Sequence, residues 1–298
     1  VVAPMNLKLL EGTIRQRVVN ILESLPVGEP FNWVDKVSIE LTTQMLATLF
    51  DFPFEDRRKL TRWSDVATSD EFSGIVESED QRRAELTECL MYFNELWRQR
   101  TGKPGNDLIS MLANGTATRD MPQTEFLGNL VLLIVGGNDT TRNSISGGVL
   151  ALNQFPEQYD KLRANPALIP NMVAEMIRWQ TPLAYMRRTA LVDTELGGKT
   201  IRKGDKVAMW YISGNRDETV FKDADSLIID RPNARQHLSF GFGIHRCMGN
   251  RLAEMQLRIL WEEIMVRFRQ VEVVGEPVRV SNAFVKGYSE LPVVVHPL

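Results

Sequence analysis

The segment 240–249 brings a cysteine, a histidine and three glycines together in the order Phe-Gly-Phe-Gly-Ile-His-Arg-Cys-Met-Gly. An amphipathic helical pattern follows it, so Cys247 precedes the start of a helix. Free amides and the positive end of the helix dipole favour an anion there and lower the pKa of a thiol from its reference value of ~8.5. The glycines allow the backbone to turn tightly and to lie close to a flat ligand. We therefore expect Cys247 to be a thiolate that binds a metal ion.

The two cysteines of the chain, Cys89 and Cys247, lie far apart in the sequence. This spacing argues against a disulfide framework and against a tetrahedral zinc site, and it favours a reducing, cytoplasmic location. A single cysteine is more often a small buried apolar side chain than a ligand. Cys89 fits that description because it lies within a helical pattern, whereas the glycine-rich surroundings of Cys247 favour a ligand.

A second polar group interrupts an apolar helical pattern, with the sequence Gly-Gly-Asn-Asp-Thr-Thr over 136–141. Each glycine in a helix interior lowers helix stability by roughly 1 kcal/mol relative to alanine. Two glycines in succession therefore indicate a packing or functional role. The hydroxyl of Thr140 could donate to the carbonyl of Gly136 and bend the helix. Such a bend would open a groove and place Asp139 and Thr140 to deliver protons. The alternative is a tolerated kink in which Asp139 faces water.

Glu175 and Arg178 are three residues apart, on one face of a predicted helix. Taken alone, such a pair on a protein surface stabilises the folded protein by only a few tenths of a kcal/mol.

The pattern Phe-x-x-Gly-x-His-x-Cys-x-Gly resembles the haem-binding signature of the cytochrome P450 superfamily. This resemblance implies a haem b cofactor with Cys247 as the axial ligand of its iron. It further implies that Phe240 packs beside the sulfur and that His245 donates to a haem propionate. Gly243 and Gly249 would let the backbone pass close to the porphyrin.

Other positions match the same family. The resemblance implies that Arg188, which precedes a short strand, holds a haem propionate, although Met186 stands where some relatives place an acidic residue. It also implies that Arg231 joins Glu175 and Arg178 in a structural triad that holds the core around the haem.

The acid–threonine pair also has a counterpart in the family. The resemblance implies that Thr140 supports protonation of bound oxygen and that Asp139 relays the protons. Two other classes stay open at this point: a haem-binding carrier or gas sensor that is not an enzyme, and a peroxide-driven oxygenase. The sensor needs neither residue and the peroxide-driven enzymes usually replace both, so their presence favours a monooxygenase that uses dioxygen and electrons.

The family match also predicts positions that face the substrate, and all of them are apolar or lack a side chain. They are Leu132, Val135, Gly136, Ala184, Met186, Phe284 and Val285. None could pair with a charged group at the reacting carbon, so an apolar chain or ring is expected. The segments 178–188 and 243–251 resemble the bacterial branch that hydroxylates the terminal carbon of medium-chain alkanes and fatty acids. Steroid or terpenoid hydroxylation is the alternative.

The sequence carries no flavin or iron–sulfur domain, so electrons from NAD(P)H should arrive through a separate ferredoxin and its reductase. Arg235, Arg246 and Arg251 flank the cysteine segment. They either form a basic docking face for an acidic carrier or are ordinary solvated surface.

Composition narrows the remaining classes. The formal net charge of −3 and the lack of a basic stripe give no reason to expect nucleic acid. The longest apolar run, 130–135, ends in glycines and is too short to span a membrane, which predicts a buried helix.

Periodicity predicts the elements that must position these residues. Apolar residues at steps of three and four predict helices over 7–25, 34–49, 55–66, 80–100, 123–155 and 251–268. Short β-rich runs predict strands over 189–192, 199–201, 206–209 and 291–296. We expect a mainly α (α+β) fold, a helical bundle with small β-sheets, in a single domain over 1–298. Because the chain begins at Val1 and the family has more sequence before it, we expect this P450 domain to be incomplete at its N-terminus.

Overall fold

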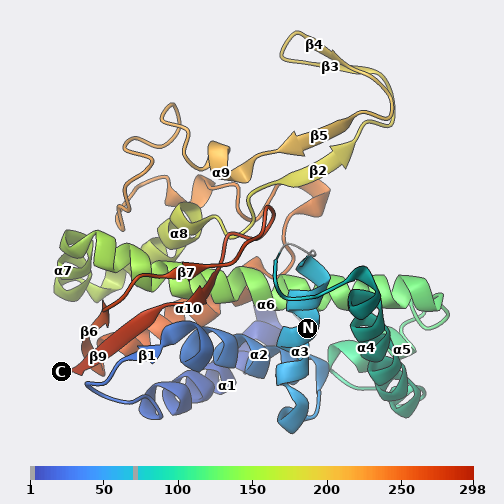
Figure 1. Cartoon of the computed structure of the whole chain (residues 1–298), viewed down its shortest axis with the longest axis horizontal. Helices are drawn as coiled ribbons and strands as arrows, with labels where there is room; N and C mark the ends of the chain where they lie inside the picture. Colours follow the sequence, from blue (N-terminus) through green and yellow to red (C-terminus); the bar gives the residue numbers. More distant parts are fainter. Residues whose placement is uncertain (1–3, 70–72) are drawn as a thin grey trace.

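A computed structural model describes residues 4–69 and 73–298 of the chain (Figure 1). The α-helices are α1 (Pro4–Glu23), α2 (Glu40–Phe50), α3 (Arg58–Thr68), α4 (Glu79–Arg100), α5 (Leu108–Asn114), α6 (Gln123–Gln154), α7 (Pro156–Ala164), α8 (Ile169–Gln180), α9 (Tyr211–Gly214) and α10 (Asn250–Met265). A π-helix, η1 (Val34–Ile39), precedes α2, and the 3-10 helices are η2 (Phe54–Asp56), η3 (Pro166–Leu168), η4 (Ala234–Gln236) and η5 (Gly243–His245). No helix in this described part of the chain is long and apolar enough to cross a bilayer.

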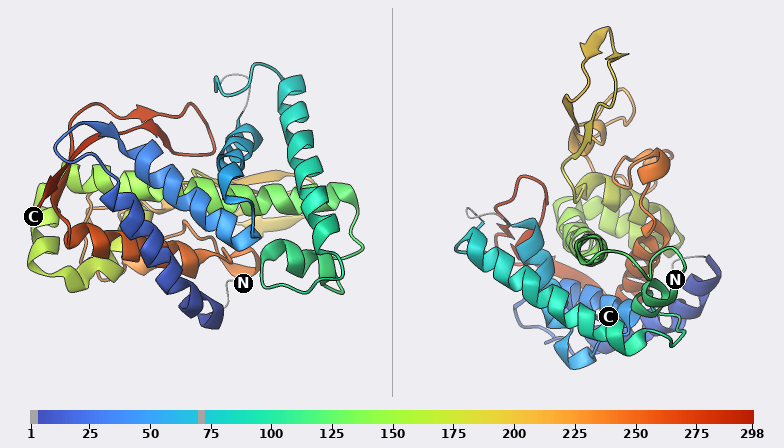
Figure 2. Two further views of the ribbon diagram at one scale, coloured as in Figure 1. Left: turned by 90° about the horizontal axis from the view of Figure 1, so that it is seen from below. Right: turned by 90° about the vertical axis from the view of Figure 1, so that its right-hand side faces the viewer.

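The strands form small antiparallel sheets. They are β1 (Phe31–Asn32), β2 (Met186–Thr189), β3 (Thr194–Leu196), β4 (Lys199–Ile201), β5 (Lys206–Met209), β6 (Phe268–Val273), β7 (Val278–Arg279), β8 (Tyr288–Glu290) and β9 (Pro292–Pro297). The largest sheet has the order β1-β9-β6, and β2 pairs with β5 so that Met186 lies opposite Met209. The β3–β4 hairpin projects away from the helices in both Figure 1 and the right panel of Figure 2.

The long helix α6 crosses the centre of the molecule and organises the rest (Figure 1). Phe126, Leu130 and Ile134 recur every four residues and are buried against α3, α4 and α5. Leu132 and Gly136 recur at the same step on another face and are exposed. From Thr141 to Leu152 every residue is buried. The open face of α6 therefore ends at Thr140, beside the polar group of interest.

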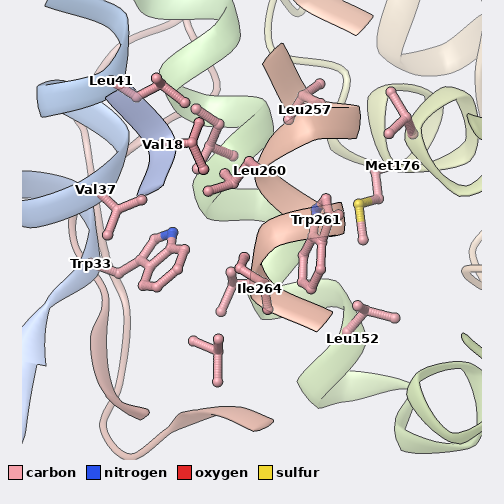
Figure 3. Packing of buried hydrophobic residues seen from close by; sticks show 14 of the residues in the cluster. Val18, Trp33, Val37, Leu41, Leu152, Met176, Leu257, Leu260, Trp261 and Ile264 are labelled. Atoms are coloured by element: carbon pink, nitrogen blue, oxygen red, sulfur yellow. The ribbon is translucent and has the colours of Figure 1, made fainter. Parts of the chain in front are cut away.

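The main hydrophobic core lies where α1, η1, α2, α6, α8 and α10 meet (Figure 3). Trp33 and Trp261 are its largest fully buried side chains. Leu257, Leu260 and Ile264 repeat at helical spacing on α10 and point into this core. The packing fixes α10, and with it the position of the cysteine segment that immediately precedes this helix.

Most predicted elements are confirmed. The helix expected over 123–155 is α6, which ends one residue earlier, and the helices expected over 7–25 and 80–100 correspond to α1 and α4. The strands expected over 199–201 and 206–209 are β4 and β5, and the segment 291–296 forms most of β9. The fold class, mainly α with small sheets, is also confirmed.

Three predictions of local structure are wrong. The strand expected over 189–192 lies over Met186–Thr189, because this register lets β2 pair with β5. The helix expected over 251–268 ends at Met265, and Phe268 instead begins β6, where it pairs with β9. The apolar run 130–135 is not uniformly buried, since Leu132 is 70% exposed on the open face of α6.

Candidate functional site

The cysteine segment folds into a compact loop at the start of α10. The backbone N–H of Cys247 donates to the carbonyl of Phe240 at 2.8 Å and closes this loop. Gly241 and Gly243 adopt φ values of 66° and 70°, a left-handed region that strongly favours glycine. A Cβ atom at position 241 would also lie 3.1 Å from the hydroxyl of Tyr211. Backbone conformation therefore accounts for these two glycines without reference to a ligand.

The thiol of Cys247 is exposed and lies at the beginning of α10. Hydrogen bonds from the backbone amides of Gly249 and Asn250 and the nearby charge of Arg246 favour the thiolate, as the sequence predicted. Desolvation by the surrounding protein is the larger effect and raises the pKa of Cys247. The start of α10 therefore does not by itself lower the pKa of this thiol, and the role of Cys247 as a thiolate ligand stays a prediction. A bound metal cation would reverse this balance, because a thiol that coordinates a metal is deprotonated.

The surface around the thiol fits a flat, largely apolar group. Phe242, Ile244 and Met248 are 84%, 97% and 68% exposed within seven residues of chain. Single exposed apolar side chains are ordinary, but a contiguous group of them marks a surface that binds something apolar. Phe240 differs from them, because it is half-buried and packs on His237 with 5.1 Å between the ring centroids.

The two residues predicted to hold carboxylates are free to do so. Arg188 lies on β2, and among the residues that the structure describes its guanidinium donates only to the carbonyl of the preceding residue, at 3.0 Å. His245 lies in η5 and is exposed. Within 4–69 and 73–298, neither side chain forms an ion pair. An exposed thiol, apolar neighbours and unpaired cationic or polar side chains together fit haem and its propionates.

Thr140 lies at the end of the open face of α6. Its hydroxyl donates to the carbonyl of Gly136 at 3.1 Å, which is the hydrogen bond predicted from the sequence. The helix continues as an α-helix through this step. A Cβ atom at Gly136 would meet no other atom within 4 Å, whereas one at Gly137 would lie 2.6 Å from Leu46. Gly137 thus permits close packing with α2, and Gly136 leaves open space beside Thr140.

Asp139 is fully buried, so the alternative in which it faces water is wrong. Its carboxylate accepts from Arg142 at 2.5 Å and from Ser64 of α3 at 3.1 Å. Arg142 also pairs with Asp65 of α3 at 2.8 Å. Burial raises the pKa of Asp139, and Arg142 opposes that effect. The carboxylate and the Thr140 hydroxyl therefore have separate hydrogen-bond partners, although the two residues are adjacent.

The remaining residues predicted to face the substrate fall into two groups. Leu132, Val135 and Gly136 lie on α6, with Leu132 the most exposed. Ala184 and Phe284 are brought together across two chain segments, because the N–H of Ala184 donates to the carbonyl of Phe284 at 2.9 Å.

Two residues remain from that prediction. Val285 forms an antiparallel bridge with Leu183 and is only 4% exposed, so it presents little surface. Met186 is half-buried on β2.

The predicted triad is assembled around a buried carboxylate. Both oxygens of Glu175 accept from Arg178 at 2.7 Å, and Arg231 approaches them at 3.0 and 3.1 Å. All three side chains are buried. Their arrangement ties α8 to the segment that leads into the cysteine loop.

Sequence reasoning missed several polar residues around the site. Arg142 could have been found, because it lies three residues after Asp139 on the same helix. Ser64 could not, because it precedes Asp139 by 75 positions and no motif marks it. Asn215 was not missed, because its resemblance to a stretch common in bacterial members of the family predicts a structural role. Its side chain accepts from the N–H of Leu238 at 2.7 Å and donates to Ser239 at 2.9 Å, just before the cysteine segment.

His237 was also missed. It is buried at the start of the cysteine segment, and its Nδ1 accepts from the N–H of Ser239 at 3.2 Å. Burial, followed by the charges of Arg246, Arg178 and Arg235, lowers the pKa of His237 to about 4. The imidazole is therefore neutral at physiological pH.

Comparison with known proteins agrees with this geometry. The family model described as Cytochrome P450 matches residues 12–286. The chain is 39% identical over 296 residues to linalool 8-monooxygenase of Pseudomonas putida. The matched region covers 99% of this chain and 73% of that protein. It is 32% identical over 290 residues to a methyl-branched lipid omega-hydroxylase of Mycobacterium bovis, covering 95% of this chain and 68% of the relative. The solved structure of cytochrome P450-153 from Novosphingobium aromaticivorans superposes with a TM-score of 0.92 and 54% identity, over 99% of this chain and 72% of that one.

Replacing Glu175 with glutamine should strongly destabilise the protein. The change removes the negative charge between two buried guanidinium groups, and breaking a buried ion pair from one side typically costs about 3–5 kcal/mol. Urea unfolding measures the loss. Glu254→Gln is the control, because Glu254 pairs with the exposed Arg235 and its loss should cost at most about 1 kcal/mol. Equal losses in the two variants would contradict the role of the triad.

His237 should make the protein less stable in mild acid. The pKa of His237 is about 4 in the folded protein, against the ordinary histidine value of 6.5. The unfolded chain therefore gains a proton first as the pH falls, and stability declines between pH 6.5 and about 4 by up to about 3 kcal/mol. Urea unfolding across this range, compared with His237→Gln, measures the difference. The variant should lose less stability than the wild type, and parallel curves would contradict the prediction.

Proposed function

Because the chain belongs to the cytochrome P450 family, we propose that it is a haem-thiolate monooxygenase that hydroxylates the terminal carbon of medium-chain alkanes or fatty acids. The observation that carries the proposal is the exposed Cys247 thiol at the start of α10, set among exposed apolar side chains. The acid–threonine pair on α6 supports oxygenation rather than haem storage or gas sensing.

The residues that would hold the haem come from two parts of the chain. Cys247 is the proposed axial ligand, and Arg188 and His245 are the proposed partners of the propionates. Phe242, Ile244 and Met248 would lose exposed apolar area when the cofactor covers them. Haem, when bound, supplies the iron at which dioxygen is activated for insertion into a C–H bond.

Protons would be handled by side chains of α6. We propose that the Thr140 hydroxyl releases the Gly136 carbonyl to donate at the reaction site and that Asp139 then replenishes its proton. The carboxylate of Asp139 is held by Arg142 and Ser64, so a water molecule or a rotation of the carboxylate is needed to connect it to Thr140. Burial raises the pKa of Asp139 and so favours its protonated form relative to that of an exposed aspartate.

The substrate proposal rests on the apolar lining and on two relatives. One relative is named as a methyl-branched lipid omega-hydroxylase, which supports terminal oxidation of an apolar chain. Another is named linalool 8-monooxygenase, and this favours a terpenoid as the second candidate substrate.

Electrons would come from NAD(P)H through a ferredoxin and its reductase. Arg246 and Arg251 are exposed beside the cysteine loop, and Arg235 is exposed although it pairs with Glu254 at 3.2 Å. These three arginines are the proposed contact for an acidic carrier.

Absorbance spectroscopy followed by turnover tests the proposal. The haem-reconstituted protein, reduced with dithionite and exposed to carbon monoxide, should show the strongly red-shifted Soret band of a thiolate ligand, and Cys247→Ala should lack it. With a supplied ferredoxin and reductase, medium-chain alkanes and fatty acids should yield primary alcohols. A normal spectrum with products from terpenoids alone would select the second candidate. Absence of the band in haem-loaded wild type would contradict the assignment of Cys247.

Thr140→Ala should separate electron consumption from product formation. Product formed per NAD(P)H should fall at least about tenfold while hydrogen peroxide rises, because a positioned proton donor contributes factors of 10²–10⁴. Ser144→Ala is the matched control, since its hydroxyl donates to the carbonyl of Thr140 at 2.8 Å in the same type of helix bond. Undiminished product in Thr140→Ala would contradict the role of its hydroxyl.

A further inference from the structure

Asn282 connects two parts of the chain through one side chain. Its Oδ1 accepts from the backbone N–H of Phe284 at 2.8 Å and from that of Val285 at 2.9 Å. Its Nδ2 donates to the carbonyl of Thr68 at 2.7 Å. Thr68 is the last residue of α3, where helix carbonyls lack partners within the helix. The amide of Asn282 thus shapes a turn and ties it to the end of α3.

The turn that Asn282 shapes is also fixed on its other side. The carbonyl of Phe284 accepts from the N–H of Ala184, and the carbonyl of Ala184 accepts from the N–H of Ile212 at 3.1 Å. A continuous run of hydrogen bonds therefore leads from α3 through Asn282 to Phe284 and Ala184. Both of these residues are predicted to face the substrate.

The end of α3 is tied to the other predicted wall of the substrate site as well. Ser64 donates to Asp139, and Asp65 pairs with Arg142, so α3 is held to α6 just beyond its open face. The same short stretch of α3 thereby contacts both α6 and the turn at 282–285. The spacing between the two walls depends on both connections.

We propose that Asn282 is a positioning residue that holds the Phe284–Val285 turn against the end of α3 and so determines which carbon of the substrate is oxidised. This inference rests on the proposed function, because it takes Phe284, which this turn carries, to face the substrate. Asn282 itself acts through the turn and through α3.

Two variants separate the two hydrogen-bonding roles of the amide. Asn282→Ala removes both, whereas Asn282→Asp keeps the acceptor for the two amides and loses the donor to Thr68. Asn153→Ala is the matched control. Asn153 likewise donates to a backbone carbonyl of another element, that of Val271 at 2.9 Å, and accepts from the N–H of Val273 at 3.0 Å, but it ties the far end of α6 to β6.

Hydrogen–deuterium exchange of the haem-loaded protein gives a readout that needs no turnover. In Asn282→Ala the amides of 284–285 should exchange roughly fivefold to tenfold faster, the factor expected for one lost hydrogen bond. In Asn282→Asp they should remain protected. Unchanged exchange in the alanine variant would show that Asn282 does not position the turn and would overturn the proposal.

The distribution of products is the second readout. Both Asn282 variants should shift oxidation of an alkane from the terminal carbon toward internal carbons, by at least about threefold in the product ratio, and Asn153→Ala should not, even if it lowers the melting temperature equally. A shift in Asn282→Ala but none in Asn282→Asp would overturn the proposal, because the tie to α3 would then have no effect. If the wild type oxidises neither alkanes nor fatty acids, the proposed function fails. Deuterium exchange alone then decides whether Asn282 positions the turn.

Discussion

The buried carboxylate of Glu175 is the point at which the helical core and the cysteine loop are joined. Arg178 uses all five of its N–H donors around it, two on Glu175 and the others on the carbonyls of Asn215, Ala224 and Ser226. Arg231 adds a second guanidinium and reaches carbonyls of the same segment. Buried charges gain little net stability over apolar packing, but losing one partner leaves the others uncompensated. The triad therefore fixes one arrangement of a segment that has little secondary structure of its own.

The two sides of the candidate site are held by different means. Backbone hydrogen bonds and glycine conformations position Cys247, and the apolar face of α10 is buried in the main core. On the other side, side-chain bonds between α3 and α6 hold Asp139. The cysteine loop is thus set by the folding of its own segment, whereas the acid–threonine pair depends on the packing of two helices.

Local sequence predicted the helices, strands and motifs better than it predicted whether each side chain is buried or exposed. The period of apolar residues identified α6 to within one residue at its end, and the back-bond of Thr140 followed from spacing alone. The burial of Asp139 could not follow, because it depends on where α3 lies against α6, and the exposure of Leu132 could not follow because it depends on which face of α6 the other elements leave open. The backbone amides at the start of α10 lower the pKa of Cys247, as expected from the sequence, but desolvation, which depends on the surrounding fold, is the larger effect and raises it. Arg231 and Arg188 were predicted only from the resemblance to the P450 family, because no local spacing connects either residue to Cys247.

Helix α3 contacts both the residues around Asp139 and the turn at 282–285, which are the two sides of the proposed substrate site. It provides Ser64 and Asp65 to the cluster around Asp139, and its last carbonyl accepts the bond from Asn282. A small displacement of α3 would lengthen the Ser64–Asp139 bond and move the Phe284–Val285 turn at the same time. In the proposed function Asp139 must exchange a partner before it can reach Thr140, so the position of α3 would affect both how the proposed substrate lies in the site and how readily that carboxylate is released.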